Sequence, residues 1–326
     1  MNKKAYLSDA IFTESIETAA TRDGFGKGLV AAGKKDKDVV ALCADLTEST
    51  RIEDFQEAFP DRFIEVGVAE QNLATVAAGM ALAGKIPFIA SYAAFSPGRN
   101  WEQIRTTIAL NEANVKIVGS HAGISVGPDG ATHQALEDIA LMKVMPGMKV
   151  IYPADSVEAK KATIVAATEE GPVYIRLARA GTPVMTTEKT PFSFGKAVKF
   201  WEGNDVTIIA SGPLVYEALK AARMLSEVGI DVDLLNVHTI KPLDEKAIVA
   251  SVKNTGAVVT VEEHQIIGGV GGAVAEAMSR QHPVPIEMIG MQDRYGESGE
   301  AEELIEYFQL TAPYIVQAVK KVMKRK

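Results

Sequence analysis

Short runs of apolar and β-branched residues recur along the chain, and most are followed by stretches that favour helix. Runs without polar alternation are typical of strands buried on both faces, as in a parallel sheet between layers of helices. Strands joined through helices form βαβ units with right-handed crossovers. We therefore expect an α/β fold of mainly parallel sheets flanked by helices. The expected strands are 38–44, 62–66, 115–120, 149–152, 172–177, 206–210, 232–237 and 257–261.

Helix-forming stretches with recognisable ends lie between these strands. Asp155 and Ser156 form a typical helix start, and Gly84 and Gly229 are typical stop residues. The basic residues near the C-terminus suit a solvated helix end, because cations are favourable against the helix dipole there. The expected helices are 71–82, 156–169, 216–228 and 272–280.

The length of 326 residues predicts two domains, since a domain usually has roughly 100–200 residues. Residues 182–191 lack hydrophobic periodicity and contain two prolines, which is typical of a linker. We expect a first domain of residues 1–185, a linker of residues 186–194 and a second domain of residues 195–326. Each domain is expected to contain its own mainly parallel sheet.

Charge, cysteine content and hydropathy narrow the class of protein. The net charge of −8 argues against broad binding to nucleic acid or to membrane surfaces. Cys43 is the single cysteine, so no disulfide forms within the chain, and a reducing cytoplasm is the natural location. No apolar run approaches the roughly 20 residues of a membrane span. We expect a cytoplasmic protein without nucleic-acid or membrane partners.

The segment from His121 to Gln134 is the strongest candidate for a functional site. It follows an expected strand, and its three glycines and one proline predict a long loop. Ligands bind beyond the carboxyl ends of strands in open α/β sheets. His121, Asp129 and His133 supply groups that exchange protons or hydrogen bonds near neutral pH. From composition alone, the segment could equally be a loop with a purely structural role.

Three further segments each have a functional and a structural interpretation. Glu70 opens the helix after strand 62–66, where a carboxylate also suits the helix dipole. Tyr92 and Phe95 could stack on a planar ring or could belong to the core. Arg176 and Arg179 could bind phosphate or could be a pair of surface arginines.

The glycines at 268–272 suggest a dinucleotide loop, but the full GxGxxG pattern falls short. The preceding strand ends with two acids, Glu262 and Glu263, which would not suit a pyrophosphate site. Close packing of the backbone is therefore the favoured interpretation of these glycines.

Taken in order, these segments resemble the transketolase family. The resemblance lies in the glutamate-bearing helix (67–88), the GxDGxTHQ loop (121–138), ADLTES (44–49), ATR (20–22) and YGESG (295–299). It covers nearly the whole chain, and the loop is the most specific part. The resemblance implies two domains of that family, a pyrimidine-binding domain and the transketolase C-terminal domain.

One region that transketolases usually carry is absent from the sequence. Their N-terminal domain holds the diphosphate through a metal ion and has a Gly-Asp-Gly…Asn signature, which does not occur here. The chain is therefore similar to the C-terminal subunit of a split transketolase. The resemblance implies thiamine diphosphate as cofactor, with Mg²⁺ or Ca²⁺ held by an N-terminal subunit. It also implies a homodimer core, with two of each chain in the full enzyme.

The resemblance assigns cofactor contacts to four residues. Glu70 would hydrogen-bond the pyrimidine ring as a catalytic residue, and Tyr92 and Phe95 would hold the ring. The family usually has phenylalanine where Tyr92 stands. Asp45 would lie near the cofactor at the subunit contact.

The resemblance also assigns contacts to sugar phosphates. His133 would contact the reacting hydroxyls as a second catalytic residue, and Asp129 would bind the hydroxyl beside the carbonyl. The sugar phosphate would be bound by Arg22, Ser49, His121 and Arg179. The activity implied is transfer of a two-carbon ketol unit from a ketose phosphate to an aldose phosphate.

Three alternatives stay open on the sequence. A 1-deoxyxylulose-5-phosphate synthase has a similar loop but tends to have aspartate in place of His121, and it lacks Gly-Glu-Ser-Gly. The beta subunits of 2-oxo-acid dehydrogenases have this size and these domains but lack the GxDGxTHQ loop. A non-catalytic binding or regulatory paralogue could keep the fold, although Glu70, His121, Asp129 and His133 are all present.

Overall fold

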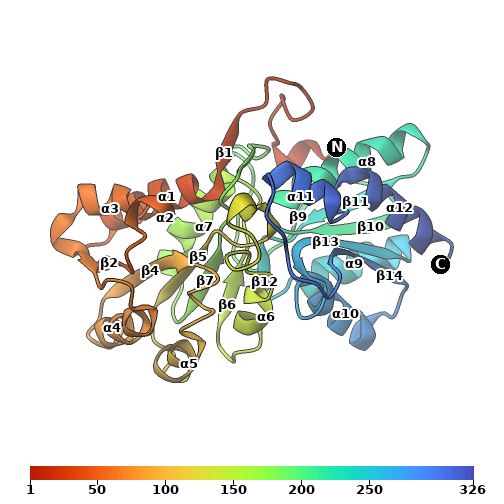
Figure 1. The fold of residues 1–326 in the computed structure, drawn as a ribbon. Helices are drawn as coiled ribbons and strands as arrows, with labels where there is room; N and C mark the ends of the chain where they lie inside the picture. The colour runs from red at the N-terminus through yellow and green to blue at the C-terminus, as the bar shows by residue number, and fades with distance from the viewer.

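The computed structural model describes residues 1–326 and contains two large, mainly parallel sheets. Figure 1 shows most of the first half of the chain on one side of the molecule and the second half on the other, with the N-terminus beside α8 (Val215–Glu227) of the second half. Helices cover both faces of each sheet, as the uninterrupted apolar strands predict. The expected α/β class is confirmed.

The first sheet has seven strands, and all of its neighbouring pairs are parallel except the one that involves β12. β12 comes from the second half of the chain and pairs antiparallel with β6, so the two halves share this sheet. In spatial order the strands are β12 (Thr239–Lys241), β6 (Lys149–Ile151), β7 (Val173–Arg176), β5 (Lys116–Ser120), β4 (Ile86–Tyr92), β2 (Val39–Cys43) and β3 (Phe63–Glu65).

Two groups of helices flank this sheet. Alternate residues of β2 face opposite sides: Val39, Ala41 and Cys43 join the core cluster of α1 and α7, and Val40 and Leu42 join that of α4 and η3. The elements are α1 (Thr21–Lys35), α2 (Thr47–Thr50), α3 (Glu53–Ala58), η2 (Pro60–Arg62), α4 (Glu70–Leu82), α5 (Trp101–Gln103), η3 (Ile104–Ala109), η4 (Ile124–Asp129), α6 (Asp138–Lys143) and α7 (Ser156–Thr168).

The contact between α1 and α7 depends on two glycines one helical turn apart. A Cβ atom at Gly24 would lie 1.9 Å from the Ser156 carbonyl oxygen, and one at Gly28 would lie 2.8 Å from that of Lys160. Only a residue without a side chain allows the backbones to approach this closely. The contact fixes the start of α1, where Arg22 lies in the first turn.

The second sheet has five strands, of which only β9 is antiparallel to its neighbour. Its order is β14 (Ile286–Met291), β13 (Val258–Gln265), β10 (Val206–Ala210), β11 (Val232–Asn236) and β9 (Val198–Trp201). The flanking elements are η5 (Gly212–Leu214), α8 (Val215–Glu227), α9 (Glu245–Thr255), α10 (Val270–Gln281), α11 (Ala301–Tyr307) and α12 (Ala312–Met323). A short third sheet pairs β1 (Thr18–Ala20) with β8 (Gly181–Pro183), and η1 (Lys3–Ala5) lies near the N-terminus.

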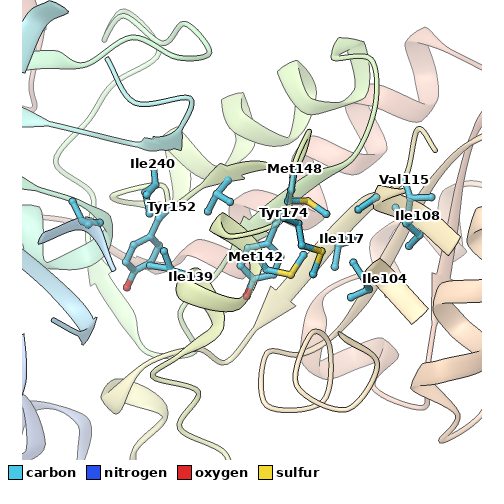
Figure 2. Packing of buried hydrophobic residues seen from close by; sticks show 14 of the residues in the cluster. Ile104, Ile108, Val115, Ile117, Ile139, Met142, Met148, Tyr152, Tyr174 and Ile240 are labelled. Atoms are coloured by element: carbon cyan, nitrogen blue, oxygen red, sulfur yellow. The ribbon is translucent and has the colours of Figure 1, made fainter. Parts of the chain in front are cut away.

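One apolar core runs across both halves of the chain. Figure 2 shows part of it, from Ile104 and Ile108 of η3 past Met142 and Tyr174 to Ile240 of β12. The same cluster continues into β11, α9 and α10 of the second half. Burial of this shared surface holds the two sheets in one arrangement.

All eight expected strands and all four expected helices are present, with ends within a few residues of the expectation. The C-terminal lysines lie at the end of α12, as predicted. Among the elements that were not predicted are helix α1, which contains four glycines, and strands β4, β9, β12 and β14. The loop after β5 is not wholly irregular, because it contains short 3₁₀ turns that are interrupted at Gly127. No helix combines the length and the apolarity that crossing a membrane requires.

A buried histidine between the two halves makes stability depend on pH. The His238 ring stacks on Phe192 at 4.2 Å between centroids, and its Nε2 atom has no hydrogen-bond partner. Burial lowers the pKa of His238 to about 4. Its unfolded pKa is about 6.5, so below pH 6.5 the unfolded chain takes up a proton that the folded chain does not.

We therefore expect His238 to destabilise the fold as the pH falls from about 6.5 to 4, by up to roughly 1.4 kcal/mol per pH unit. Urea unfolding of the wild type and of His238→Gln at several pH values measures this difference. The wild-type free energy of unfolding should fall more steeply with acid than that of the variant. Parallel pH profiles of the two proteins would contradict the prediction.

Candidate active site

The residues selected from the sequence gather at the carboxyl ends of the parallel strands of the first sheet. Asp45 follows β2, and Glu70 lies beyond β3 as the first residue of α4. Tyr92 ends β4 and is the register partner of Ser120, which places it beside His121. Arg179 follows β7. This edge is where ligands bind in open α/β sheets.

Glu70 is a buried carboxylate, with 2% of its side chain exposed. Its Oε2 accepts a hydrogen bond from Arg99 Nη1 at 2.9 Å, and its backbone carbonyl accepts one from Asn100 Nδ2 at 2.9 Å. Arg99 and Asn100 belong to the turn between β4 and α5, and the sequence did not single them out. A buried acid held from a separate turn suits a functional role better than simple compensation of the helix dipole.

Four aromatic rings form a cluster beside this carboxylate. Tyr92 stacks on His121 at 3.9 Å between centroids and lies 5.9 Å from Phe95 in a near-parallel arrangement. The His133 ring meets Phe95 edge-on at 5.5 Å. Tyr92 and Phe95 are only partly buried, so they line the site and are not enclosed in the core. Faces of this kind bind planar rings.

A basic group adjoins the cluster. Arg22 Nη1 donates to the Ser49 carbonyl at 2.6 Å and lies 3.5 Å from His121 Nε2, and Arg22 Nε is buried without a partner. Arg179 donates to the Val126 carbonyl at 2.6 Å. Burial, together with the nearby charges of Arg22 and Arg179, lowers the pKa of His121 to about 3. The His121 imidazole is therefore neutral at physiological pH and can both donate and accept.

Asp45 and His121 both have left-handed backbone conformations, with φ values of 58° and 54°. Such residues are uncommon outside glycine and cluster at functional sites. Glu65 holds the turn around Asp45, because its carboxylate accepts hydrogen bonds from the backbone N–H groups of Asp45 and Gly67, each at 2.8 Å. The side chains of Asp45 and Asp129 are exposed and make no hydrogen bond within this chain.

The second half of the chain holds the histidine loop, residues 121–134, in place. Gln134 Nε2 donates to the Glu297 carbonyl at 2.9 Å, and Glu263 Oε1 accepts from Ser125 N at 2.6 Å. A Cβ atom at Gly296 would lie 1.9 Å from Gln134 Oε1. The segment 294–299 therefore positions the loop and needs glycine at this point.

Gly296→Ala is expected to lower the free energy of unfolding by about 1–3 kcal/mol, because the added methyl group overpacks a tight contact. Urea unfolding of the isolated chain measures the loss. Gly79→Ala is a matched control, since a Cβ atom at Gly79 meets nothing within 4 Å and Gly79 lies inside α4. The control should gain about 0.5–1 kcal/mol. Equal effects of the two substitutions would argue against the contact.

Arg176 is not the surface residue that its position after a strand suggested. It is fully buried, and its Nε donates to Asp138 Oδ2 at 2.8 Å. Its Nη2 donates to the carbonyl groups of Ala135 and Glu263. Arg176 thus holds the backbone at Ala135, directly after the histidine loop, and its side chain is enclosed within the protein.

The glycine-rich start of α10 is a packing feature, as expected. The Glu262 carboxylate accepts hydrogen bonds from the N–H groups of Val270 and Gly271, each at 2.7 Å. A Cβ atom at Gly269 would lie 2.0 Å from Glu262 Oε2. The carboxylate already occupies the helix N-terminus that a pyrophosphate would need. No group of three or more His, Cys, Asp or Glu side chains is arranged to hold a metal ion.

Comparisons with known proteins identify both halves of the chain. Residues 17–184 match the family model "Transketolase, pyrimidine binding domain", and residues 195–315 match "Transketolase, C-terminal domain". The 6-deoxy-6-sulfo-D-fructose transketolase subunit SqwH of Clostridium sp. (strain MSTE9) is 43% identical over 97% of this chain and 98% of its own length. An apulose-4-phosphate transketolase subunit of Phocaeicola vulgatus is 36% identical over 94% of this chain and 98% of its own length.

Longer relatives and a solved structure extend the match. Human transketolase is 37% identical over 92% of this chain, which corresponds to 48% of the human protein. The solved structure described as "Split gene transketolase, inactive beta4 tetramer" is 46% identical, with a TM-score of 0.89, over 94% of this chain and 99% of that chain. The chain therefore belongs to the transketolase family, as a C-terminal subunit of a split transketolase.

Proposed function

We propose that the site transfers a two-carbon ketol unit from a ketose phosphate to an aldose phosphate, with thiamine diphosphate bound between this chain and an N-terminal subunit. The observation that carries the proposal is the buried Glu70 carboxylate beside the partly open rings of Tyr92 and Phe95. An acid at the edge of a ring-binding surface fits an aminopyrimidine, which presents both an aromatic face and a ring nitrogen.

The residues present fit the cofactor's pyrimidine half. The planar Arg99 cation already makes a hydrogen bond to Glu70 and lies over the Phe95 ring, so this space accepts a flat nitrogenous group. Glu70 would hydrogen-bond the ring nitrogen, Tyr92 and Phe95 would contact its faces, and Asp45 would lie near it at the subunit contact. When bound, thiamine diphosphate supplies the electron sink for cleavage and formation of the C–C bond.

The sugar phosphate would lie along the histidine loop. His133 borders Phe95 and would exchange a proton with the reacting hydroxyl, and Asp129 would bind the hydroxyl beside the carbonyl. Arg22, with its unpartnered Nε, and Arg179 would bind the phosphate, because guanidinium groups suit phosphate oxygens. Neutral His121 and Ser49 would complete the phosphate site.

The complete enzyme would need a second kind of chain. The N-terminal subunit would hold the diphosphate through Mg²⁺ or Ca²⁺. The assembly would contain a homodimer of this chain with two copies of the partner, and it would act in the cytoplasm on sugar phosphates such as those of the pentose phosphate pathway.

Mixing this chain with a candidate N-terminal subunit, thiamine diphosphate and Mg²⁺ tests the proposal. Ketol transfer from xylulose 5-phosphate to ribose 5-phosphate should occur in the mixture and in neither chain alone. Since similar subunits are named for 6-deoxy-6-sulfo-D-fructose and apulose 4-phosphate, both sugars are tested as alternative donors. A mixture that binds the cofactor but transfers no ketol unit from any donor would argue for a binding or regulatory paralogue.

A further inference from the structure

One cation connects the two groups that the proposed function assigns to the pyrimidine ring. Arg99 Nη1 lies 2.9 Å from Glu70 Oε2, and Arg99 Cζ lies 5.1 Å from the centroid of the Phe95 ring. The Glu70 side chain is 2% exposed, whereas the Arg99 side chain is 52% exposed. The guanidinium thus reaches in from solvent, contacts an aromatic ring and neutralises a buried acid.

A guanidinium resembles an aminopyrimidine in shape and in stacking, although the guanidinium donates to Glu70 where the pyrimidine ring nitrogen would accept from it. It is planar, stacks on aromatic faces and donates N–H groups to a carboxylate. Arg99 contacts the same Phe95 ring and the same Glu70 carboxylate that the pyrimidine ring is proposed to use. We propose that Arg99 is an internal stand-in for the pyrimidine ring, which neutralises Glu70 in the cofactor-free chain and must move aside when the cofactor binds. This inference rests on the proposed function.

The charge balance explains why a stand-in is needed. Arg99 is the only cationic side chain within 4 Å of the Glu70 carboxylate. A buried carboxylate without a partner is strongly unfavourable, so the empty site would otherwise be unstable or would collapse. The half-exposed Arg99 can leave by rotating into water, where its charge is well solvated.

The turn that carries Arg99 is rigidly built. The Arg99 N–H donates to the Phe95 carbonyl at 2.9 Å, and Asn100 Nδ2 bonds both the Glu70 carbonyl and Ser96 Oγ. A Cβ atom at Gly98 would lie 2.0 Å from the Ala94 carbonyl oxygen, so the turn needs glycine there. The backbone therefore fixes where the Arg99 side chain starts, and only the side chain has to move.

Displacement of Arg99 makes cofactor affinity depend on the ion pair. Because coupling is reciprocal, the free energy by which Arg99 stabilises the empty site is subtracted from that of cofactor binding. Removing the Arg99 side chain should lower the free energy of unfolding of the cofactor-free chain and should also lower the Kd for the cofactor. An arginine that stays beside the bound ring as a positioning residue would change the affinity in the opposite direction.

The first measurement uses the isolated full chain without cofactor. Urea unfolding of Arg99→Gln, Glu70→Gln and the double variant at pH 7 gives the coupling between the two side chains. We expect Arg99→Gln to lower the equilibrium constant for folding about fivefold, and this loss to be small when Glu70→Gln is already present. Arg105→Gln removes another exposed charge that makes no ion pair, and it should have no coupling to Glu70.

The second measurement titrates thiamine diphosphate with Mg²⁺ into the assembly with the N-terminal subunit, followed by calorimetry. Arg99→Gln should lower the Kd about fivefold relative to the wild type, with Arg99→Lys between them and Arg105→Gln unchanged. If the cofactor still binds and Arg99→Gln leaves its Kd unchanged or raises it, the proposal for Arg99 is wrong and the proposed function is unaffected. Absence of binding to every variant and to the wild type overturns the proposed function as well, while absence of Arg99–Glu70 coupling in the isolated chain overturns only the stand-in.

Discussion

Glu70→Gln is expected to lower the turnover of the assembled enzyme by about 10²–10⁴-fold, the range typical of a lost acid–base group. Glutamine has the size of glutamate and can still donate an N–H group to a ring nitrogen. It cannot give up or take back a proton at neutral pH. Binding of thiamine diphosphate should therefore survive in part, while the proton exchange that the buried carboxylate supports is lost.

Turnover by the Glu70→Gln assembly and its Kd for thiamine diphosphate are both measured. The prediction requires a large loss of turnover together with only a partial loss of cofactor affinity. Glu102→Gln is a matched control, because this exposed glutamate lies in the neighbouring helix α5 and contacts no proposed site residue. It should leave both values unchanged. Wild-type turnover in the Glu70→Gln assembly would remove Glu70 from the catalytic residues.

The gathering of these residues could be predicted because it follows from topology. Parallel strands end at one edge of the sheet, so Asp45, Glu70, Tyr92, His121 and Arg179 meet there. The apolar runs made those strands visible in the sequence. Strand β4 was missed because its polar and aromatic end was interpreted only as a possible core or ring-binding segment.

Other features depend on packing between distant segments, and local sequence carries little information about them. Arg99 reaches Glu70 only because the turn around Gly98 returns the chain to the start of α4. The strand β12 joins the first sheet although its sequence position lies in the second half. Helix α1 contains four glycines, which lower helix propensity, and at Gly24 and Gly28 close packing against α7 overrides that preference.

Arg176 shows most clearly that local sequence does not reveal packing between distant segments. Its sequence position suggested a phosphate-binding or surface arginine, but the side chain is fully buried. Asp138 is its buried partner and also accepts a hydrogen bond from the Tyr174 hydroxyl at 2.7 Å. Burial and the proximity of Asp138 raise the pKa of Tyr174 well above its usual range, so the phenol stays a donor. Together these side chains join β7, α6, β13 and Ala135, which directly follows the histidine loop.

Asp138→Asn is expected to lower the free energy of unfolding by about 3–5 kcal/mol, because it leaves the Arg176 charge buried without its counter-ion. Arg176→Met should lose a similar amount by leaving Asp138 unpaired. The double variant Asp138→Asn with Arg176→Met should lose less than the sum of the two single variants, since neither charge of this pair is then left without its partner. Urea unfolding of the isolated chain measures all three. Lys85→Met, which removes one partner of the partly exposed Lys85–Asp38 pair, is a control that should change the free energy of unfolding by less than about 1 kcal/mol. Losses of the two single variants that simply add in the double variant would mean that packing, and not charge pairing, makes these residues important.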